Sequence, residues 1–172
     1  MNRSPSLPHL LAPALVAGAL CACAGPGTPV PGLADEEAAS AVIDDFHTAA
    51  AEADFDRYFA HFAEGAVFLG TDASERWTVA EFMAFARPHF RPGGGWTYLP
   101  RDRHVSFTPD GRTAYFDELL DNEGLGETRG SGVLVREDGA WKVAQYDLSI
   151  PIPNELAGQV VARIRASRVT PP

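Results

Sequence analysis

Apolar residues recur at helical spacing in the first part of the chain. Between residues 35 and 62 they fall at steps of three and four, with acidic residues on the opposite side, which predicts helical structure. A second helical pattern covers residues 78–90, where Thr78 and Glu81 have the spacing of a capping box. The short apolar run 66–70 lies between these patterns and is typical of a strand.

The period changes to that of strands in the second part of the chain. Four strand-like runs follow one another, over residues 96–108, 112–121, 128–136 and 140–149. Asp-Gly pairs separate the first run from the second and the third from the fourth, and such pairs favour tight hairpin turns. An amphipathic stretch over 154–164 predicts a final helix. Helices followed by an antiparallel meander indicate an α+β domain.

An apolar segment precedes the predicted domain. Arg3 is followed by an apolar run from Leu10 to Leu20, which is too short to cross a bilayer as a helix but typical of a signal peptide. The run ends in LCAC, which resembles the lipobox of bacterial lipoproteins with Cys23 as the lipidated residue. We therefore expect a signal peptide over residues 1–22 and a protein exported across the inner membrane and lipid-anchored in the cell envelope. An ordinary cleaved signal peptide, with Cys23 free or oxidised, is the alternative.

Proline and glycine dominate the segment that follows. Residues 23–34 are expected to form an extended tether behind the lipidated cysteine. The folded domain is then expected over residues 35–166, a length that suffices for one hydrophobic core. The formal net charge is −9 and Lys142 is the only lysine, so nucleic acid is excluded as an expected partner.

Two stretches resemble a known family. GTDASERW, over residues 70–77, and RGSGVLVREDGAWKVAQYDLSIPIPNEL, over 129–156, are similar to the SnoaL-like branch of the nuclear transport factor 2 superfamily. The resemblance covers roughly residues 38–155 and implies a cone-shaped, bent antiparallel sheet packed on N-terminal helices around a central pocket. Members include isomerases, cyclases, hydrolases and non-catalytic modules, so the fold implies no single function. Many relatives carry histidines at the positions of Gln145 and Asp147, and this chain has neither of them. No cofactor is expected.

The last hairpin predicts one set of pocket residues. If residues 137–139 form a three-residue turn, Ser131 faces Gln145 and Arg129 faces Asp147, all on one face of the sheet. This face has an apolar floor with a polar end, as ligand pockets commonly have. These four residues are therefore predicted to bind a ligand. The alternative is a solvated ion pair between Arg129 and Asp147, worth about 0–1 kcal/mol.

The other hairpin raises the question of which neighbouring carboxylate faces the pocket. A three-residue turn in TPDGRT would place Arg103 opposite Asp117 and His104 diagonal to Glu118. Asp102 would then face Glu118, and two like charges opposite each other are unfavourable. Either a bulge breaks this pairing, or Glu118 is partly desolvated and its pKa is raised. Glu118 is thus the predicted general acid or base, with His104 beside it as a ligand-binding residue.

The remaining candidates are less specific. Asp72 and Trp77 are predicted to bind ligand at the pocket rim, with turn capping and core packing as their alternatives. His47, His61 and His89 fall on predicted helices without the spacing of metal ligands, so they are expected to be surface or packing residues and no metal site is expected.

Three functions fit these patterns. The first is a membrane-tethered domain that binds a small molecule, apolar to amphipathic, with one or two polar groups. The second is an isomerase, cyclase or hydrolase in which Glu118 moves a proton while Arg129 or Gln145 stabilises negative charge. The third is a non-catalytic association module that forms a homodimer through the outer face of its sheet.

Overall fold

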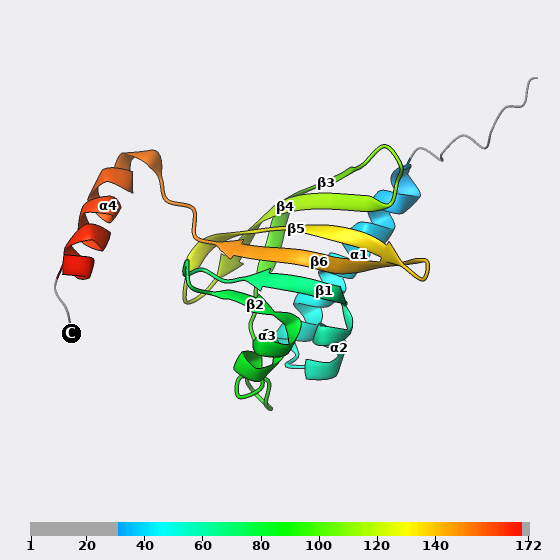
Figure 1. The fold of residues 1–172 in the computed structure, drawn as a ribbon, viewed down its shortest axis with the longest axis horizontal. Helices are drawn as coiled ribbons and strands as arrows, with labels where there is room; N and C mark the ends of the chain where they lie inside the picture. The colour runs from blue at the N-terminus through cyan, green and yellow to red at the C-terminus, as the bar shows by residue number, and fades with distance from the viewer. Residues whose placement is uncertain (1–30, 170–172) are drawn as a thin grey trace, which may run out of the picture.

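The computed structural model describes residues 31–169, so the predicted signal peptide and Cys23 lie outside the described residues. The described elements are α1 (Leu33–Ala51), α2 (Phe55–Ala60), β1 (Phe62–Leu69), β2 (Arg76–Thr78), α3 (Val79–Ala86), β3 (Leu99–Phe107), β4 (Thr113–Asn122), β5 (Gly126–Glu137), β6 (Ala140–Ser149) and α4 (Asn154–Val169). Figure 1 shows them as a bent sheet with α1 across one face and α4 standing apart.

The described strands form one six-stranded sheet in the order β2-β1-β6-β5-β4-β3. Every neighbouring pair is antiparallel except β1 and β6, which run parallel. The strands β3 to β6 form a meander, and β1 pairs with its last strand, β6. The inner face of the sheet packs against α1 and α3 (Figure 1). The predicted α+β fold with a bent, largely antiparallel sheet is confirmed.

Local signals in the sequence account for the helix starts. Thr78 and Glu81 form the predicted capping box at the start of α3, and the carboxylate of Asp54 accepts a hydrogen bond from the backbone N–H of Arg57 at the start of α2. The helical prediction runs too far at its end, since β1 begins at Phe62. Gly65 has φ 71° within that strand, where the β1–β6 register shifts.

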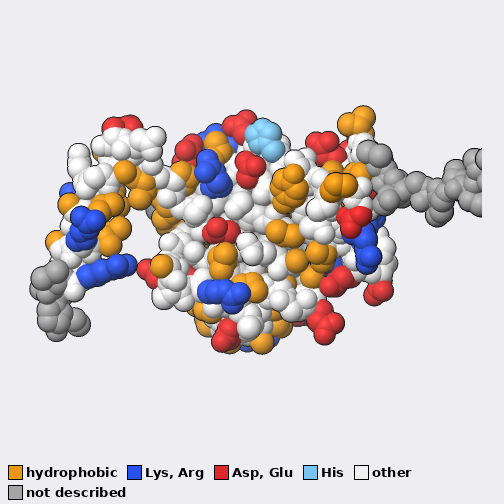
Figure 2. All heavy atoms as spheres, turned by 45° about the horizontal axis from the view of Figure 1, so that its top comes forward, with side chains coloured by type: hydrophobic (Ala, Val, Ile, Leu, Met, Phe, Trp, Pro, Cys, Tyr) orange, Lys and Arg blue, Asp and Glu red, His pale blue; other side chains and the backbone are white. Residues whose placement is uncertain are grey.

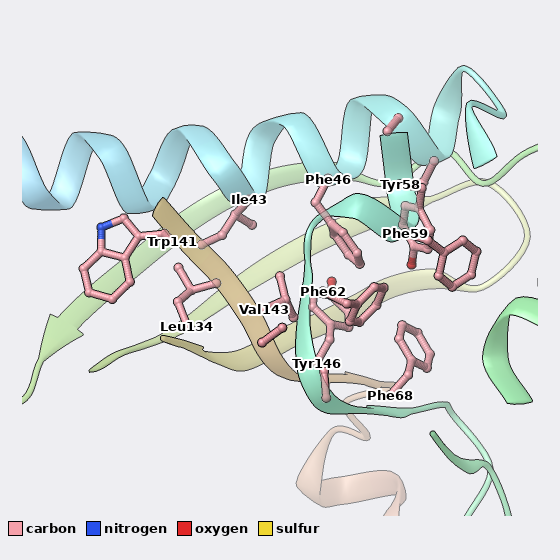
Figure 3. Close-up of a cluster of buried hydrophobic side chains, with 14 of the residues drawn as sticks. Ile43, Phe46, Tyr58, Phe59, Phe62, Phe68, Leu134, Trp141, Val143 and Tyr146 are labelled. Carbon is pink, nitrogen blue, oxygen red and sulfur yellow. The ribbon is translucent and has the colours of Figure 1, made fainter. Parts of the chain in front are cut away.

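Aromatic side chains fill the core between α1 and the sheet. Figure 3 shows Phe46 of α1, Tyr58 of α2 and Phe62 of β1 close together between α1 and the sheet. The rings of Phe46 and Tyr58 stack with centroids 4.4 Å apart, and Phe46 also lies 5.1 Å from the ring of Tyr146. These contacts fix the position of α1 over the sheet.

The β5–β6 hairpin turns on two residues, not the predicted three. Asp138 and Gly139 have φ values of 51° and 83°, and Glu137 pairs with Ala140 across the turn. Two positive φ values are typical of a type I′ turn, which suits the twist of a hairpin better than a longer loop. The register is therefore one residue away from the predicted one.

A bulge at Ala144 then changes which residues of β6 face inwards. Leu134 pairs with Val143 and Val133 with Gln145, which leaves Ala144 as the extra residue. Trp141 and Val143 are buried before the bulge. After it the buried residues are Tyr146 and Leu148.

The four predicted pocket residues consequently lie on the outer face of the sheet, and their predicted inward orientation is wrong. Ser131 pairs with Asp147, while Gln145 pairs with Val133 and Arg129 with Ser149. Arg129 and Gln145 are exposed, and the other two are half-buried. The predicted pairing of Arg129 with Asp147 is absent because the shorter turn and the bulge together move the register by two residues at this point.

The β3–β4 hairpin is also one residue out of the predicted register. Its loop has four residues, closed by Thr108 against Thr113, and His104 instead of Arg103 pairs with Asp117. Further along, Arg101 pairs with Leu119, so β3 has one residue more than β4 between these two pairs. Asp102, with φ 50°, is the residue at this bulge.

The end of the chain leaves the sheet. Residues 150–153 lead away from β6 to α4, which stands apart from the body in Figure 1. None of the helices within residues 31–169 combines the length and the apolar composition needed to cross a membrane.

Candidate functional site

A cavity of about 200 Å³ lies between the helices and the inner face of the sheet. Aromatic rings form most of its wall, and polar groups are few. The lining residues are Phe46, His47, Ala50, Tyr58, Phe68, Gly70, Thr71, Glu75, Trp77, Phe82, Phe85, His89, Trp96, Tyr98, Leu125, Tyr146 and Leu148. An apolar cavity with a small number of convergent polar groups is the usual form of a small-molecule site.

Several of the aromatic rings are nearly parallel. Phe82 lies at 11° to Trp77, at 14° to Trp96 and at 17° to Phe68, with centroids 3.9–5.9 Å apart. These rings come from β1, β2, α3 and the segment before β3, so the sheet edge and α3 together build one wall. A wall of parallel rings presents flat apolar faces, which complement a flat ligand.

A chain of hydrogen bonds runs from the cavity into the protein. Nε2 of His47 lies 2.6 Å from Oε1 of Glu118, and Nε of Arg103 donates to Oε2 of the same carboxylate at 2.8 Å. The side chain of Glu118 has no exposed surface and that of His47 has 6%, whereas Arg103 retains 12%. Only His47 of the three lines the cavity, so Glu118 and Arg103 stand behind it.

The fold explains why these three groups meet. Glu118 alternates inwards with Phe116 and Leu120 along β4, and Arg103 alternates inwards with Val105 and Phe107 along β3. Arg103 is further held by Asp44 and by the carbonyl of Ser40, both on α1.

The buried carboxylate therefore has a built-in counter-charge. Burial acts to lower the pKa of Arg103, but the charge and hydrogen bonds of Glu118 and of Asp44 outweigh it and raise the pKa. The guanidinium stays charged. In a buried ion pair of this kind, removing either partner leaves the other as an uncompensated buried charge and destabilises the fold.

The same contact determines how His47 presents its ring. A carboxylate can only accept, so the nitrogen that meets Glu118, Nε2, carries the proton. In the neutral ring Nδ1 is then the acceptor, and no described residue hydrogen-bonds to it. His47 lines the cavity, and Nδ1 is its ring nitrogen that can take up a proton.

Three tyrosines complete the polar part of the cavity. Burial raises the pKa of Tyr58 and of Tyr146 well above 10.0, and it raises that of Tyr98 as well. No hydrogen bond joins any of these hydroxyls to another described residue. Since they stay protonated, they can donate hydrogen bonds to an oxygen atom of a ligand.

Gly130 leaves the space that Tyr146 and Glu118 occupy. A Cβ at this position would lie 2.4 Å from the hydroxyl oxygen of Tyr146 and 3.0 Å from Oε1 of Glu118. The absence of a side chain on β5 therefore lets the phenol approach the carboxylate from the neighbouring strand.

The predicted site residues have different fates. Trp77 lines the cavity, and its binding of a ligand stays a prediction. Asp72 lies in the exposed β1–β2 loop, where its carboxylate accepts hydrogen bonds from the backbone and hydroxyl of Ser74. His104 is an outer-face residue with 74% of its side chain exposed, 3.6 Å from Asp117, so its predicted place beside Glu118 is wrong.

Glu118 itself points inwards, which answers the question that the two neighbouring carboxylates raised. It contacts His47 and not the cavity directly.

The sequence did not reveal His47, Tyr58, Tyr98 and Tyr146 as site residues. His47 follows the buried Phe46 and lies four residues after Ile43, a position that a strict reading of the helical stripe would have placed near the inner face. The tyrosines carried no signal that separates a ligand-facing phenol from a packed one. Within residues 31–169, no three His, Cys, Asp or Glu side chains are grouped to hold a metal ion.

Comparison with known proteins supports the fold. Residues 39–153 match the SnoaL-like domain family, while no curated protein sequence gives a significant match. A nuclear transport factor 2-like protein of unknown function from Pseudomonas putida is 18% identical with a TM-score of 0.61, over 74% of this chain and 93% of that one.

Two further solved structures have names that suggest a reaction. A candidate dehydratase of the same superfamily from Streptomyces avermitilis is 15% identical with a TM-score of 0.59, over 70% of this chain and 98% of that chain. A candidate scytalone dehydratase from Novosphingobium aromaticivorans is 14% identical with a TM-score of 0.56, over 70% and 86%. At these identities the likeness concerns the fold alone.

Proposed function

Because the chain belongs to the SnoaL-like domain family, we propose that its cavity binds a small, flat, largely apolar molecule and that His47 moves a proton on it. The observation that carries this proposal is the hydrogen-bonded chain from Arg103 through Glu118 to His47, which ends at the cavity. A buried carboxylate that orients an imidazole is a common arrangement for a general base. Glu118 accordingly positions His47 and does not itself contact the ligand.

The cavity limits the size and shape of the ligand. A closed cavity of about 150 Å³ accommodates a benzene-sized molecule, so the 200 Å³ here suit one substituted ring or a small fused system. The parallel rings of Trp77, Phe82 and Trp96 favour a planar ligand over a branched one.

The polar groups suggest what the ligand carries. His47 can take a proton from a carbon next to a carbonyl group, and the C–H electron pair then moves into an enolate whose oxygen gains negative charge. The neutral hydroxyls of Tyr58 and Tyr146 can donate hydrogen bonds to that oxygen. Return of the proton to another carbon gives an isomer; loss of a β-hydroxyl group, with that proton, gives water and an alkene.

The dehydration branch agrees with the names of two structural neighbours, the candidate dehydratases described above. The alternative function is binding of a small molecule without catalysis. The experiment described next distinguishes the two functions.

The test uses 2-tetralone, a flat bicyclic ketone, as the probe. The protein in D₂O is expected to accelerate exchange of the α-protons, followed by NMR, and His47→Gln to slow this exchange about 100-fold or more. Quenching of tryptophan fluorescence by the probe, through Trp77 and Trp96 in the cavity wall, reports binding separately.

The matched control is His104→Gln, which removes an exposed histidine from the outer face and should leave exchange unchanged. Equal exchange in the protein and in His47→Gln would contradict the catalytic proposal. Quenching without exchange would indicate a protein that binds the probe without catalysis. The absence of both quenching and exchange would contradict binding and catalysis alike.

We also propose that the domain is exported and tethered to a membrane through a lipid on Cys23. The run from Leu10 to Leu20 and the LCAC sequence support this. Growth of a bacterial host with labelled palmitate should label the full chain, Cys23→Ser should abolish the label and Cys21→Ser should retain it. Label that depends on Cys21 instead would contradict the assignment.

A further inference from the structure

Helix α4 carries a stripe of apolar side chains that the rest of the described chain leaves largely uncovered. Leu156, Val160 and Ile164 are spaced by four residues and so share one face of the helix. Leu156 and Ile164 are 44% and 45% exposed, and Val160 is half-buried. A single helix of this length is only marginally stable in water. Packing this apolar stripe against another surface would therefore stabilise the helix.

The rim of the cavity offers a matching apolar surface. Leu125, in the β4–β5 turn, and Phe85, in α3, line the cavity and yet are 42% and 45% exposed. Leu148, at the end of β6, lines it too and lies only a few residues before α4. Leu148 thus joins the cavity wall to the strand end from which α4 leaves the sheet.

Charge favours the same contact. The last two turns of α4 hold Arg163, Arg165 and Arg168, whereas the rim loops hold Asp72 and Glu123 together with the cavity residue Glu75. Figure 2 shows basic side chains of the C-terminal helix facing the body across a gap.

One electrostatic effect already links the two parts. The pKa of Asp72 is lowered, mainly by its hydrogen bonds with Ser74, and the charge of Arg168 contributes to this lowering. Arg168 therefore lies near enough to the rim loop for its charge to act there.

The connection is short enough to keep α4 at its own cavity. Residues 149–153 span at most about 17 Å when extended, and α4 is about 24 Å long. Its first turn is tied to the end of β6, and the charge of Arg168 in its last turn acts on Asp72 in the loop that follows the neighbouring strand β1. A short tether gives the helix a high effective concentration at this rim compared with that of a second molecule.

We propose that α4 docks the face formed by Leu156, Val160 and Ile164 on the cavity rim of its own chain, and so covers the entrance. Arg163 and Arg168, which flank this face, then lie against the acidic rim loops, and Leu125 and Phe85 lose their contact with water. This docking does not depend on which molecule the cavity binds.

Disulfide trapping tests the contact and its partner together. In the full chain with Cys21 and Cys23 replaced by Ser, Leu125→Cys is combined with Ile164→Cys. Under mild oxidation at micromolar concentration this pair is expected to close within one chain, at least ten times faster than the control pair. The control replaces Ile164→Cys by Ala162→Cys, which points to the opposite side of α4.

Non-reducing electrophoresis and mass spectrometry distinguish the outcomes. A bond within one chain that is specific to position 164 supports the proposal. A covalent dimer would show that α4 docks on a second copy and would overturn the proposal. Equal rates for the two pairs, or no bond in either, would overturn it as well.

Fluorescence quenching in the protein without engineered cysteines gives an independent measurement. Replacing Arg163, Arg165 and Arg168 by Glu is expected to raise acrylamide quenching of the tryptophans at least twofold, because Trp77 and Trp96 line the uncovered cavity. The matched change Arg112→Glu, in the β3–β4 loop, is expected to have no effect. Unchanged quenching in the triple variant would overturn the docking.

Discussion

His47 and Glu118 are 71 residues apart in the chain, and Nε2 of the one lies 2.6 Å from Oε1 of the other inside the protein. The carboxylate also holds Arg103, so α1, β3 and β4 are joined through a single side chain. The group that orients the proposed base is therefore also a structural link between a helix and the sheet.

Glu118→Gln is expected to destabilise the fold, because Arg103 would lose the counter-charge of a side chain with no exposed surface. Removing one partner of a buried pair costs about 3–5 kcal/mol. Urea denaturation measures the free energy of unfolding. The neighbouring change Asp117→Asn, on the outer face, serves as the control and should stay within about 0.5 kcal/mol of the parent. Equal stability of the two variants would argue against the buried pair.

Gly130→Ala is expected to lower the free energy of unfolding by about 1–3 kcal/mol, since the added Cβ would overlap the hydroxyl of Tyr146 and crowd Glu118. Thermal unfolding and the exchange assay together measure stability and the site. Gly124→Ala is the matched control, because a Cβ there meets only Asn122 at an ordinary 3.6 Å. A Gly130→Ala protein that unfolds like the control would show that this space is not needed.

Stability is expected to fall at alkaline pH. The pKa values of Tyr58 and Tyr146 in the folded protein lie well above 10.0, so these phenols stay neutral while the unfolded chain begins to ionise. Their contribution is fully present below a pH of about 10 and is lost as the pH rises further, by up to about 1.4 kcal/mol per pH unit for each tyrosine.

The pH dependence is measured from urea midpoints on both sides of pH 10.0. Tyr146→Phe should reduce the slope above that pH. A slope identical in the parent and in Tyr146→Phe would rule out the buried phenol as its source.

A homodimer through the outer face of the sheet remains a prediction. Tyr115 on this face is 53% exposed and pairs with the half-buried Val133, and the half-buried Leu119 lies further along the same face. Light scattering at micromolar concentration should give a dimer, and Tyr115→Arg should shift it to a monomer. Glu36→Arg, on α1, introduces the same charge elsewhere and should leave the dimer intact. A monomeric parent protein would refute the prediction.

The sequence predicted the architecture because hydrophobic period and capping residues act locally. Thr78 with Glu81 and Asp54 mark helix starts that the structure confirms. The faces of the strands could not be predicted in the same way, since they depend on counting residues around turns and bulges. One residue fewer in the turn at Asp138 and one more at Ala144 were sufficient to place Arg129 and Gln145 outside.

The inward direction of Glu118 was predicted, but its partners were not. The predicted register gave Arg103 to Asp117, whereas the four-residue loop pairs Asp117 with His104 and leaves Arg103 to Glu118. His47 comes from a helix distant in sequence, and no local pattern reports a contact of that kind.

The β3–β4 loop makes the direction of Arg103 sensitive to length as well as to composition. The four-residue loop pairs His104 with Asp117, so Arg103 lies inwards beside Glu118. A slip of β3 by one residue against β4, as a three-residue loop would produce, would turn the Arg103 guanidinium towards solvent and strand Glu118 in the interior. Such a slip would act as a frameshift of side-chain direction. Redesigns that graft new ligand specificity onto this scaffold can vary the other surface loops in length, but they must conserve the residue count between His104 and Asp117.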